Sequence, residues 1–281
     1  IDTASSDGVT IDLTAPVMDA IYEGDLSEDM DLQQSTESLT LAWSGADDAS
    51  GIDQFEYAWG TTAGANDFVA WSSTSEQSAE TTGLSLQDGS MYYGSVRGTD
   101  LVGNQSATLT GDGLTIDASP PMDGVVIDGD SIDIDFTSST TTLTASWSGF
   151  TDAGSGIGEY KYAIGTEPGG TQNVYWLSVG TDTTVTNSGL TLISGITYYV
   201  SVKATDNVGN EGDFVATNGI TIDTQSPSAG TINDGIEEDL DFTVSTNTLS
   251  GNWSGFSDGL SGIAFYEYAI DTIAGGADLV V

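Results

Sequence analysis

The sequence repeats itself, and this constrains the fold more than any other feature. Trp43, Trp147 and Trp253 stand in LTLAWSG, LTASWSG and LSGNWSG, at intervals of about 105 residues. Each is followed by a related segment: DDASGIDQFEYAWG, DAGSGIGEYKYAIG and DGLSGIAFYEYAID. The segments VTIDLTAP, LTIDASPP and ITIDTQSP separate one copy from the next. Chance does not align several blocks in one order, so we expect tandem copies of one structural unit.

Apolar and polar residues alternate in short segments, which predicts β-strands. Leu39, Leu41 and Trp43 share one face of such a segment, and Tyr198 and Val200 share a face of another. Clusters of Gly, Asp and Asn separate the segments, and none has the periodicity and caps of a helix. About seven short strands per repeat predict an all-β chain of seven-stranded antiparallel β-sandwiches arranged end to end.

The proline-containing segments mark the predicted domain boundaries. Residues 1–13 are the tail of a preceding repeat, 14–118 and 119–224 are complete repeats, and 225–281 is the N-terminal half of a further repeat. Half a sandwich exposes unpaired strand edges. Two explanations stay open: the chain is an excerpt of a longer array, or a neighbouring copy completes the half-repeats by donating strands.

Three features of the repeats resemble fibronectin type III domains. One is the Trp of the second predicted strand, and another is the Tyr-rich third strand with Tyr57, Tyr162 and Tyr268. The third is the Leu-x5-Tyr pattern of residues 86–92 and 192–198, which resembles a tyrosine corner. The repeats are similar to the fibronectin type III-like (Ig-like) tandem repeats of large bacterial and archaeal cell-surface proteins. The resemblance implies a sandwich and leaves function open, because this fold has many uses.

The charge of the chain excludes several classes of partner. Its 281 residues include 43 acidic and three basic side chains, no His and no Cys, for a formal net charge of -40. Such a chain repels nucleic acids and anionic lipid surfaces. No apolar stretch is long enough to span a membrane. We expect Arg97, Lys161 and Lys203 to be solvated or paired with nearby acids. The absence of Cys suits an exported protein.

Acidic residues recur in an insertion after the first predicted strand of each repeat: EGDLSEDMD, DGDSIDID and DGIEEDLD. Gly24, Gly129 and Gly235 permit a sharp turn that lets carboxylates converge. Oxygen ligands without His or Cys fit calcium rather than zinc, copper or iron. The aligned carboxylates, predicted here to bind Ca²⁺, are Glu23, Asp128 and Asp234, then Asp29, Asp133 and Asp239, then Asp31, Asp135 and Asp241.

A second acidic set is expected at the opposite end of each repeat. Each junction is predicted to gather acids from one repeat's insertion, from the linker and from the next repeat's loops, so that bound calcium fixes the interdomain angle. Alternatively, these Asp and Asn residues only form turns. The set comprises Asp48, Asp152 and Asp258 after the second strand, Asp100, Asn104, Asp206 and Asn210 after the sixth, and Asp12, Asp117 and Asp223 in the linkers. Of these, Asp117, Asp206, Asn210 and Asp223 are predicted calcium ligands.

The sequence predicts no enzyme, because a catalytic carboxylate pair would not recur in every repeat. The leading hypothesis is an extracellular, calcium-stiffened spacer or stalk of a cell-surface adhesin or fibre. Its partners would be neighbouring repeats or copies of itself, with glycans or other cells reached through further modules. Two alternatives are a self-assembling subunit of a filament, sheath or S-layer with shared strands, and an accessory carbohydrate-binding module. The last needs exposed aromatic rings, whereas we expect Trp71 and Trp176 to lie in the core.

Overall fold

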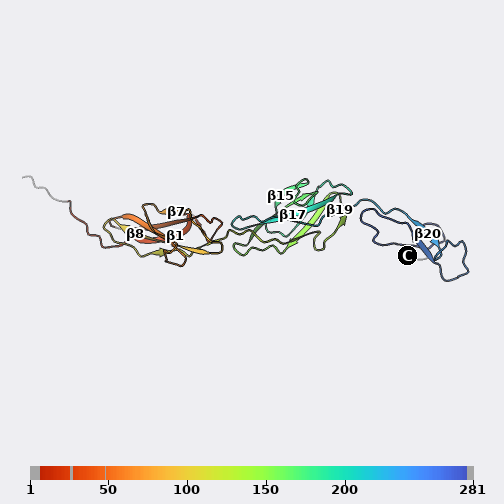
Figure 1. Cartoon of the computed structure of the whole chain (residues 1–281), viewed down its shortest axis with the longest axis horizontal. Coiled ribbons are helices and arrows are strands. Elements are labelled where there is room, and N and C mark those ends of the chain that lie inside the picture. Colours follow the sequence, from red (N-terminus) through yellow and green to blue (C-terminus); the bar gives the residue numbers. More distant parts are fainter. Residues whose placement is uncertain (1–6, 26–27, 48, 277–281) are drawn as a thin grey trace, which may run out of the picture. The chain divides into compact units, whose positions relative to one another are not determined.

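The structure is a computed structural model that describes residues 7–25, 28–47 and 49–276. Its regular elements are β-strands joined by turns and loops (Figure 1). Within this part of the chain there is no helix, and hence none long and apolar enough to cross a membrane. The chain divides into two compact units: one holds residues up to 123 with 150–160 and 203–213, and the other holds 124–149, 161–202 and residues from 214 onward.

The first repeat is a sandwich of two sheets. The order of the first sheet is β2-β1-β4-β7, with β1 Val17–Asp25, β2 Glu28–Asp29, β4 Ser38–Ala46 and β7 Ser78–Thr82. The order of the second is β3-β10-β8-β5-β6, with β3 Leu32–Gln33, β10 Leu114–Ile116, β8 Met91–Asp100, β5 Ile52–Gly60 and β6 Val69–Thr74; β9 (Leu109–Thr110) also pairs with β8.

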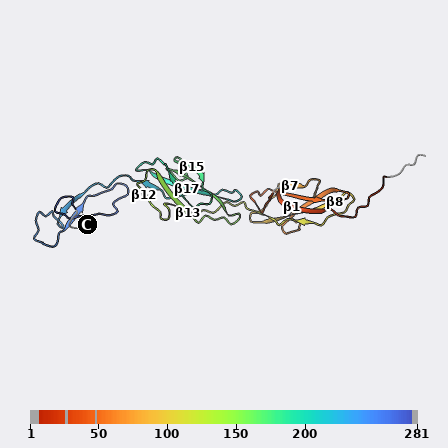
Figure 2. The ribbon, with the colours of Figure 1, turned by 180° about the vertical axis from the view of Figure 1, so that it is seen from behind.

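The second repeat has the same arrangement. One sheet runs β11-β13-β16, with β11 Val125–Asp128, β13 Thr142–Ser148 and β16 Thr184–Ser188. The other runs β12-β19-β17-β14-β15, with β12 Phe136–Thr137, β19 Ile220–Ile222, β17 Thr197–Asp206, β14 Ile157–Gly165 and β15 Val174–Ser178; β18 (Val215–Ala216) pairs with β17. The predicted all-β fold of tandem β-sandwiches is confirmed, and Figure 2 shows the strands from behind.

The core follows from the alternation along the strands. Leu39, Leu41 and Trp43 lie on the buried face of β4 and are fully shielded from solvent. The Trp43 ring packs edge-on against Phe55 and stacks on Tyr57, with centroid distances of 5.8 and 5.9 Å. Aromatic pairs at these distances add to the free energy gained from burying their area. The recurring Trp is therefore the centre of the first sandwich core.

A tyrosine corner is present in both complete repeats, as the spacing predicts. The hydroxyl oxygen of Tyr92 accepts a hydrogen bond from the backbone N–H of Gln87 at 3.2 Å. Tyr198 accepts the equivalent bond from Ile193 at 3.1 Å. Both rings are buried. Each bond ties the turn before the sixth strand of the repeat to the strand itself.

The acidic insertion crosses from one sheet to the other, which the sequence did not reveal. In the first repeat the chain turns at Gly24, whose φ is 120°, and forms the short β1–β2 pairing. It then places β3 parallel to β10, with Leu32 opposite Thr115. The second repeat pairs β12 with β19 in the same parallel way. The insertion thus joins the two sheets along one edge of each sandwich.

The segment from residue 225 onward has less regular structure than predicted. Strands β20 (Thr231–Asp234) and β21 (Gly251–Ser254) pair, and the Trp253 ring stacks on Tyr268 at 6.1 Å. The strand predicted around Tyr268 is absent, so that prediction is wrong. In the complete repeats this strand pairs with the sixth strand.

Removal of the tyrosine-corner hydroxyl should destabilise the sandwich that contains it. We expect Tyr198→Phe, and equally Tyr92→Phe, to lower the free energy of unfolding by about 1 kcal/mol, because a part-buried N–H then loses its acceptor. Urea unfolding followed by tryptophan fluorescence measures the effect. Tyr175→Phe is the matched control, since its ring is 73% exposed and its change should be neutral. Equal midpoints for Y198F and the control would contradict this role.

Candidate metal centres

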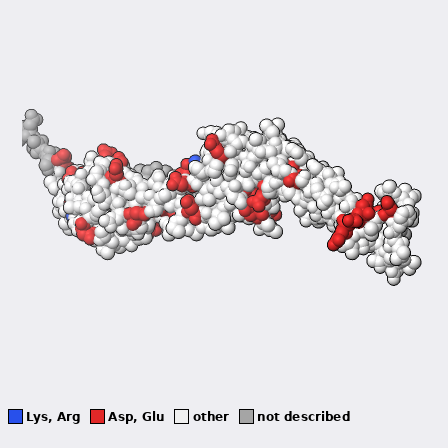
Figure 3. Space-filling view, turned by 45° about the vertical axis from the view of Figure 1, so that its right-hand side comes forward, with Lys and Arg blue, Asp and Glu red and all other residues white. Residues whose placement is uncertain are grey.

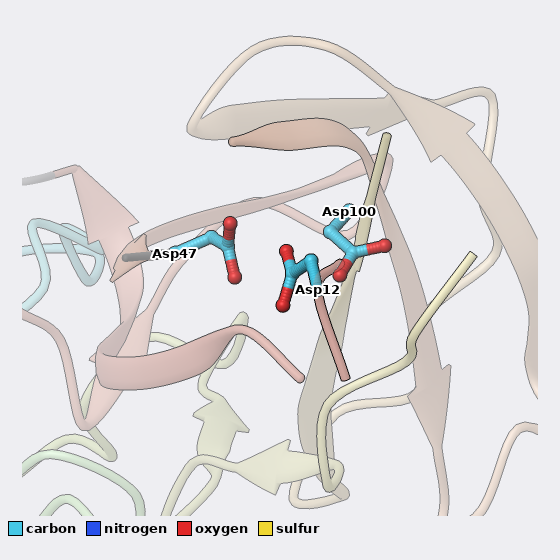
Figure 4. Close-up of side chains that lie close together, drawn as sticks. All are labelled: Asp12, Asp47 and Asp100. Carbon is cyan, nitrogen blue, oxygen red and sulfur yellow. The ribbon is translucent and has the colours of Figure 1, made fainter. Parts of the chain in front are cut away.

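Three carboxylates meet where the linker enters the first sandwich, and we call this group the first linker centre. Asp12 comes from the linker, Asp47 follows β4, and Asp100 ends β8. One oxygen from each lies within 4.8 Å of the others. In Figure 4 the carboxylate of Asp12 lies between those of Asp47 and Asp100. The folded chain thus holds three negative charges close together.

Hydrogen bonds position each carboxylate of the first linker centre. Asp12 Oδ2 accepts from the backbone N–H of Ser50 at 3.0 Å, and Asp47 Oδ2 accepts from N–H groups of its own loop. Asn104 donates its backbone N–H to Asp100 Oδ1 at 2.8 Å and its side-chain amide to Asp100 Oδ2 at 2.7 Å. These are the turn-forming bonds of the alternative interpretation. A carboxylate has about four acceptor sites, so such bonds leave room for a cation.

The second linker centre repeats this geometry with Asp117, Asp152 and Asp206. Asp117 Oδ2 accepts from the backbone N–H of Ser155 at 2.7 Å. Asn210 donates to Asp206 Oδ2 at 2.6 Å and to the backbone oxygen of Asp117 at 2.9 Å. Asp117, Asp206 and Asn210 are all buried. Three of the predicted ligands therefore gather in one place, together with Asp152.

The third linker has the same bond, although no three-carboxylate group of this kind is found there among the described residues. Asp223 Oδ2 accepts from the backbone N–H of Ser261 at 3.1 Å. Asp258 Oδ1 accepts from Gly262 at 3.0 Å. All three linker aspartates thus bond the backbone of the loop between the second and third strand positions of the repeat that follows.

Asp48 was assigned to the linker set from its distance to the recurring Trp, and it lies outside the described residues. Its neighbour Asp47 is the described residue that meets Asp12 and Asp100. Asp47, Asp152 and Asp258 each stand four residues before a glycine with positive φ, namely Gly51, Gly156 and Gly262. Alignment on that glycine identifies the correct residue, because the loop after Trp43 is one residue shorter than in the other repeats.

The insertion of the first repeat forms a separate group, the first insertion centre, from Glu23, Asp29 and Asp112. Glu23 is completely buried. Its Oε1 accepts from the backbone N–H of Gly94 at 3.3 Å, while its Oε2 has no hydrogen-bond partner. Asp29 Oδ1 accepts from the backbone N–H of Glu23 at 2.8 Å. Asp112 was not predicted, although it aligns with Asn218 before the last strand of each repeat.

The second repeat holds the corresponding acids differently. Asp128 is buried, and its Oδ2 accepts from the backbone N–H of Gly219 at 3.1 Å. Asp133 Oδ1 accepts from the backbone N–H of Asp128 at 3.1 Å. The side-chain amide of Asn218 donates to Asp133 Oδ2 at 3.0 Å and to Asp135 Oδ1 at 3.4 Å. An amide thus joins the two exposed acids of this insertion.

The remaining insertion residues have simpler roles. In the third segment Asp239 Oδ1 accepts from the backbone N–H of Asp234 at 3.0 Å, and Asp241 is exposed. The backbone oxygen of Asp31 accepts from Thr115 at 2.9 Å, which belongs to the β3–β10 ladder. Among the described residues, the groups of three carboxylates do not combine insertion and linker acids. The prediction of one shared junction site is therefore replaced by two kinds of centre.

Burial and hydrogen bonding move the pKa values of these acids in opposite directions. Burial raises the pKa of Glu23 to about 7 and that of Asp128 to about 6. The pKa of Asp12 is lowered, mainly by its hydrogen bond from Ser50. Burial by itself would raise the pKa of Asp100. The hydrogen bonds that its carboxylate accepts, above all from Asn104, have the larger effect and lower that pKa. Hydrogen bonds thus favour the ionised form of Asp12 and Asp100, and burial disfavours the ionised form of Glu23 and Asp128.

Basic side chains do not neutralise these centres. The Arg97 Nε donates to Glu56 Oε2 at 2.8 Å, and its guanidinium lies 4.3 Å from the Trp71 ring centroid. Lys203 Nζ lies 2.5 Å from Glu211 Oε1. On the face seen in Figure 3 the acids gather in clusters separated by uncharged surface. A hard cation that prefers oxygen ligands would supply the missing positive charge.

The additional tryptophans are partly covered rather than fully buried. Trp71 lies beneath the Arg97 guanidinium, and the Trp176 ring lies 6.3 Å from that of Phe214. Both residues are half-buried. A sugar-binding platform needs an open ring face, and one face of Trp71 is already occupied by Arg97. The ring arrangement in the first repeat therefore gives little support to carbohydrate binding.

Comparison with known protein sequences finds a partial similarity. No family model matches it. It is 26% identical over 239 residues to Exoglucanase B of Cellulomonas fimi, which covers 81% of this chain and 19% of that enzyme. The chain thus spans about a fifth of the length of this relative.

Three solved structures are also similar. The FN1–FN3 domains of chicken CNTN1 align at 14% identity and a TM-score of 0.35, covering 68% of this chain and 65% of that one. The fibronectin(III)-like modules of Clostridium thermocellum CbhA align at 11% and 0.38, covering 73% and 94%. Domains A168–A170 of titin align at 14% and 0.41, covering 74% and 68%.

The buried carboxyl of Glu23 predicts a pH dependence of stability in chelator. Its folded pKa of about 7 exceeds the ordinary value of 4.5, so the folded state binds the proton more tightly. Its contribution is therefore fully present below pH 4.5 and is lost as the pH rises through 7. We expect the melting temperature to fall between pH 5 and 8, and to fall less in Glu23→Gln.

Two features make this measurement specific. The linker acids Asp12 and Asp100 have lowered pKa values, so they stay ionised across the range and add no slope. Glu76 is exposed, so Glu76→Gln removes the same kind of group without changing the burial of a carboxyl. If E23Q and E76Q show the same slope as the unchanged chain, Glu23 is not the group responsible.

Proposed function

We propose that this chain is a non-catalytic, extracellular spacer whose tandem sandwiches are held in line by structured linkers and bound calcium. The observation that carries the proposal is the hydrogen bond from each linker aspartate to the backbone of the following loop. It occurs three times, from Asp12 to Ser50, from Asp117 to Ser155 and from Asp223 to Ser261. A binding pocket would not need this bond at every repeat, whereas a stiff array would.

The linker around Asp117 is bonded on both sides. Its backbone N–H donates to the carbonyl of Gln33 at 2.9 Å, while its carboxylate accepts from Ser155. The next residue, Ala118, donates its N–H to Asp88 Oδ1 at 2.8 Å. Flexible linkers are rich in Gly and Ser and leave their backbone groups to water. The bonds here favour a linker with a fixed conformation.

Calcium bound at the linker centres would further stabilise this linker conformation. Each centre of the complete repeats brings together three carboxylates, whose mutual repulsion opposes the close approach that the structure shows. Calcium binds six to eight oxygens, which carboxylates, carbonyls and water can supply together. An extracellular location supports this, because calcium is abundant there. The composition without Cys, His or a phosphate-binding loop supports a structural rather than catalytic role.

A rigid linker predicts a change in solution shape when Asp117 is removed. In Asp117→Ala the N–H of Ser155 loses its bond to the linker carboxylate and keeps only Asp152 Oδ2 of its own loop as acceptor. Hydrogen bonds to charged groups are worth up to about 1.5–3 kcal/mol. Small-angle X-ray scattering of the full chain should show a broader distribution of interatomic distances than the unchanged chain. Asp53→Ala is the control, because Asp53 is exposed and stands on β5. Identical scattering from D117A and D53A would show that this bond does not fix the linker.

The calcium component predicts stabilisation by the free ion. Addition of Ca²⁺ to the chelator-treated chain should raise the melting temperature by several degrees, because ligands that bind only the folded state stabilise it. The double variant Asp47→Asn, Asp152→Asn should lose most of this response. Differential scanning calorimetry measures it, and scattering reports whether the particle also lengthens. A response that is unchanged in the double variant would exclude calcium from the linker centres.

A further inference from the structure

We propose that the first repeat holds a hard divalent cation of the calcium class between Glu23, Asp29 and Asp112. This site lies within the sandwich, where the insertion meets the segment before β10. It is distinct from the linker centres and does not require them to bind metal. The bound ion would link the acidic insertion that follows β1 to the opposite sheet.

The geometry matches the size of such an ion. One carboxylate oxygen from each of Glu23, Asp29 and Asp112 lies within 4.8 Å of the other two. Calcium–oxygen distances are about 2.3–2.6 Å, so two ligands of one ion lie at most about 5 Å apart. Three carboxylates supply at least three oxygens, and the exposed side chains of Asp29 and Asp112 leave the outer side open to water. The arrangement therefore needs little movement to coordinate an ion.

The buried oxygen of Glu23 is the observation that points to a ligand. Glu23 is 0% exposed, and its Oε2 has no hydrogen-bond partner. A buried carboxylate oxygen without a partner is costly, and proteins almost always provide a donor or an ion for it. The chain also makes room for this carboxylate at Gly111, where an added Cβ would lie 2.0 Å from Glu23 Oε1. The Glu23 carboxylate therefore occupies the space that a side chain at position 111 would need.

The second repeat differs at the exposed acids of its insertion, although Asp128 Oδ1, like Glu23 Oε2, is buried without a hydrogen-bond partner. Asn218 occupies the position of Asp112, and its amide donates to Asp133 and Asp135. Thr217 stands where the first repeat has Gly111, and its hydroxyl bonds to Asp128. A described group of three carboxylates within 4.8 Å is found in the first repeat's insertion but not in the second's. The first repeat has a third acid where the second has a neutral amide.

No basic side chain takes the role of that amide in the first repeat. Arg97 bonds to Glu56, and Lys203 bonds to Glu211. The remaining basic residue, Lys161, stands on β14 of the second repeat. Asp112 therefore adds negative charge beside Glu23 and Asp29, and within the chain only a bound cation would offset it.

The exchange between Asp112 and Asn218 provides a matched test. Isothermal titration of the metal-free full chain with CaCl₂ gives the number of sites and their affinities. We expect Asp112→Asn to lose one site or to weaken it at least about tenfold, because ligand charge sets calcium affinity. Asn218→Asp should gain one site in the second repeat. Asp53→Asn, an exposed acid on β5, should bind as the unchanged chain does.

Further variants separate this site from the linker centres. Asp47→Asn removes a linker acid and should leave the site that depends on Asp112 unchanged. Glu23→Gln, which keeps the shape of the side chain, should abolish the same site as D112N. Each variant is first shown by circular dichroism to retain its β-structure. The inference is overturned if D112N and E23Q bind as many ions as tightly as the unchanged chain, or if N218D gains no site.

Discussion

Each linker aspartate accepts a hydrogen bond from the loop of the sandwich that follows, and the organisation of the chain depends on this contact. Asp117 is the most complete case, because its backbone belongs to the ladder beside β10 while its carboxylate caps the loop at Ser155. A charged acceptor bonded to a backbone N–H in a buried place is stronger than a neutral hydrogen bond. These bonds hold the backbone and the carboxylate of Asp117 in defined positions.

The large negative charge is the second constraint. With three basic side chains against 43 acids, most carboxylates have no basic partner and are solvated or bound by backbone N–H groups, amides or ions. The linker acids use N–H groups and Asn side chains, and hydrogen bonds lower the pKa values of Asp12, Asp100 and Asp223. Glu23 and Asp128 lie inside the sandwich, where burial raises their pKa values. Carboxylates thus occupy two different environments within one repeat, one that favours the ionised form and one that disfavours it.

Sequence patterns predicted the sandwich well because its core residues follow a simple period. The alternation around Trp43 and the spacing to Tyr92 are local properties, and both appear in the structure as expected. The strand around Tyr268 failed because a strand also needs a partner, which local sequence does not contain. Asp112 was missed for a similar reason: it lies far from Glu23 along the chain, and the packing of β1 against β8 and the segment at Gly111 brings them together.

The sequence by itself determined the repeat, the all-β sandwich, the tyrosine corners and the recurrence of acids at fixed positions. These properties depend on periodicity and composition, which are read along one dimension. Only the tertiary structure decided which acids meet: it separated linker acids from insertion acids, brought Asp47 beside Asp12 and Asp100, and left one oxygen of Glu23 buried without a donor. The physical reason is that convergence of side chains depends on how loops cross between sheets, and a shift of one residue in a loop changes which carboxylate points inward.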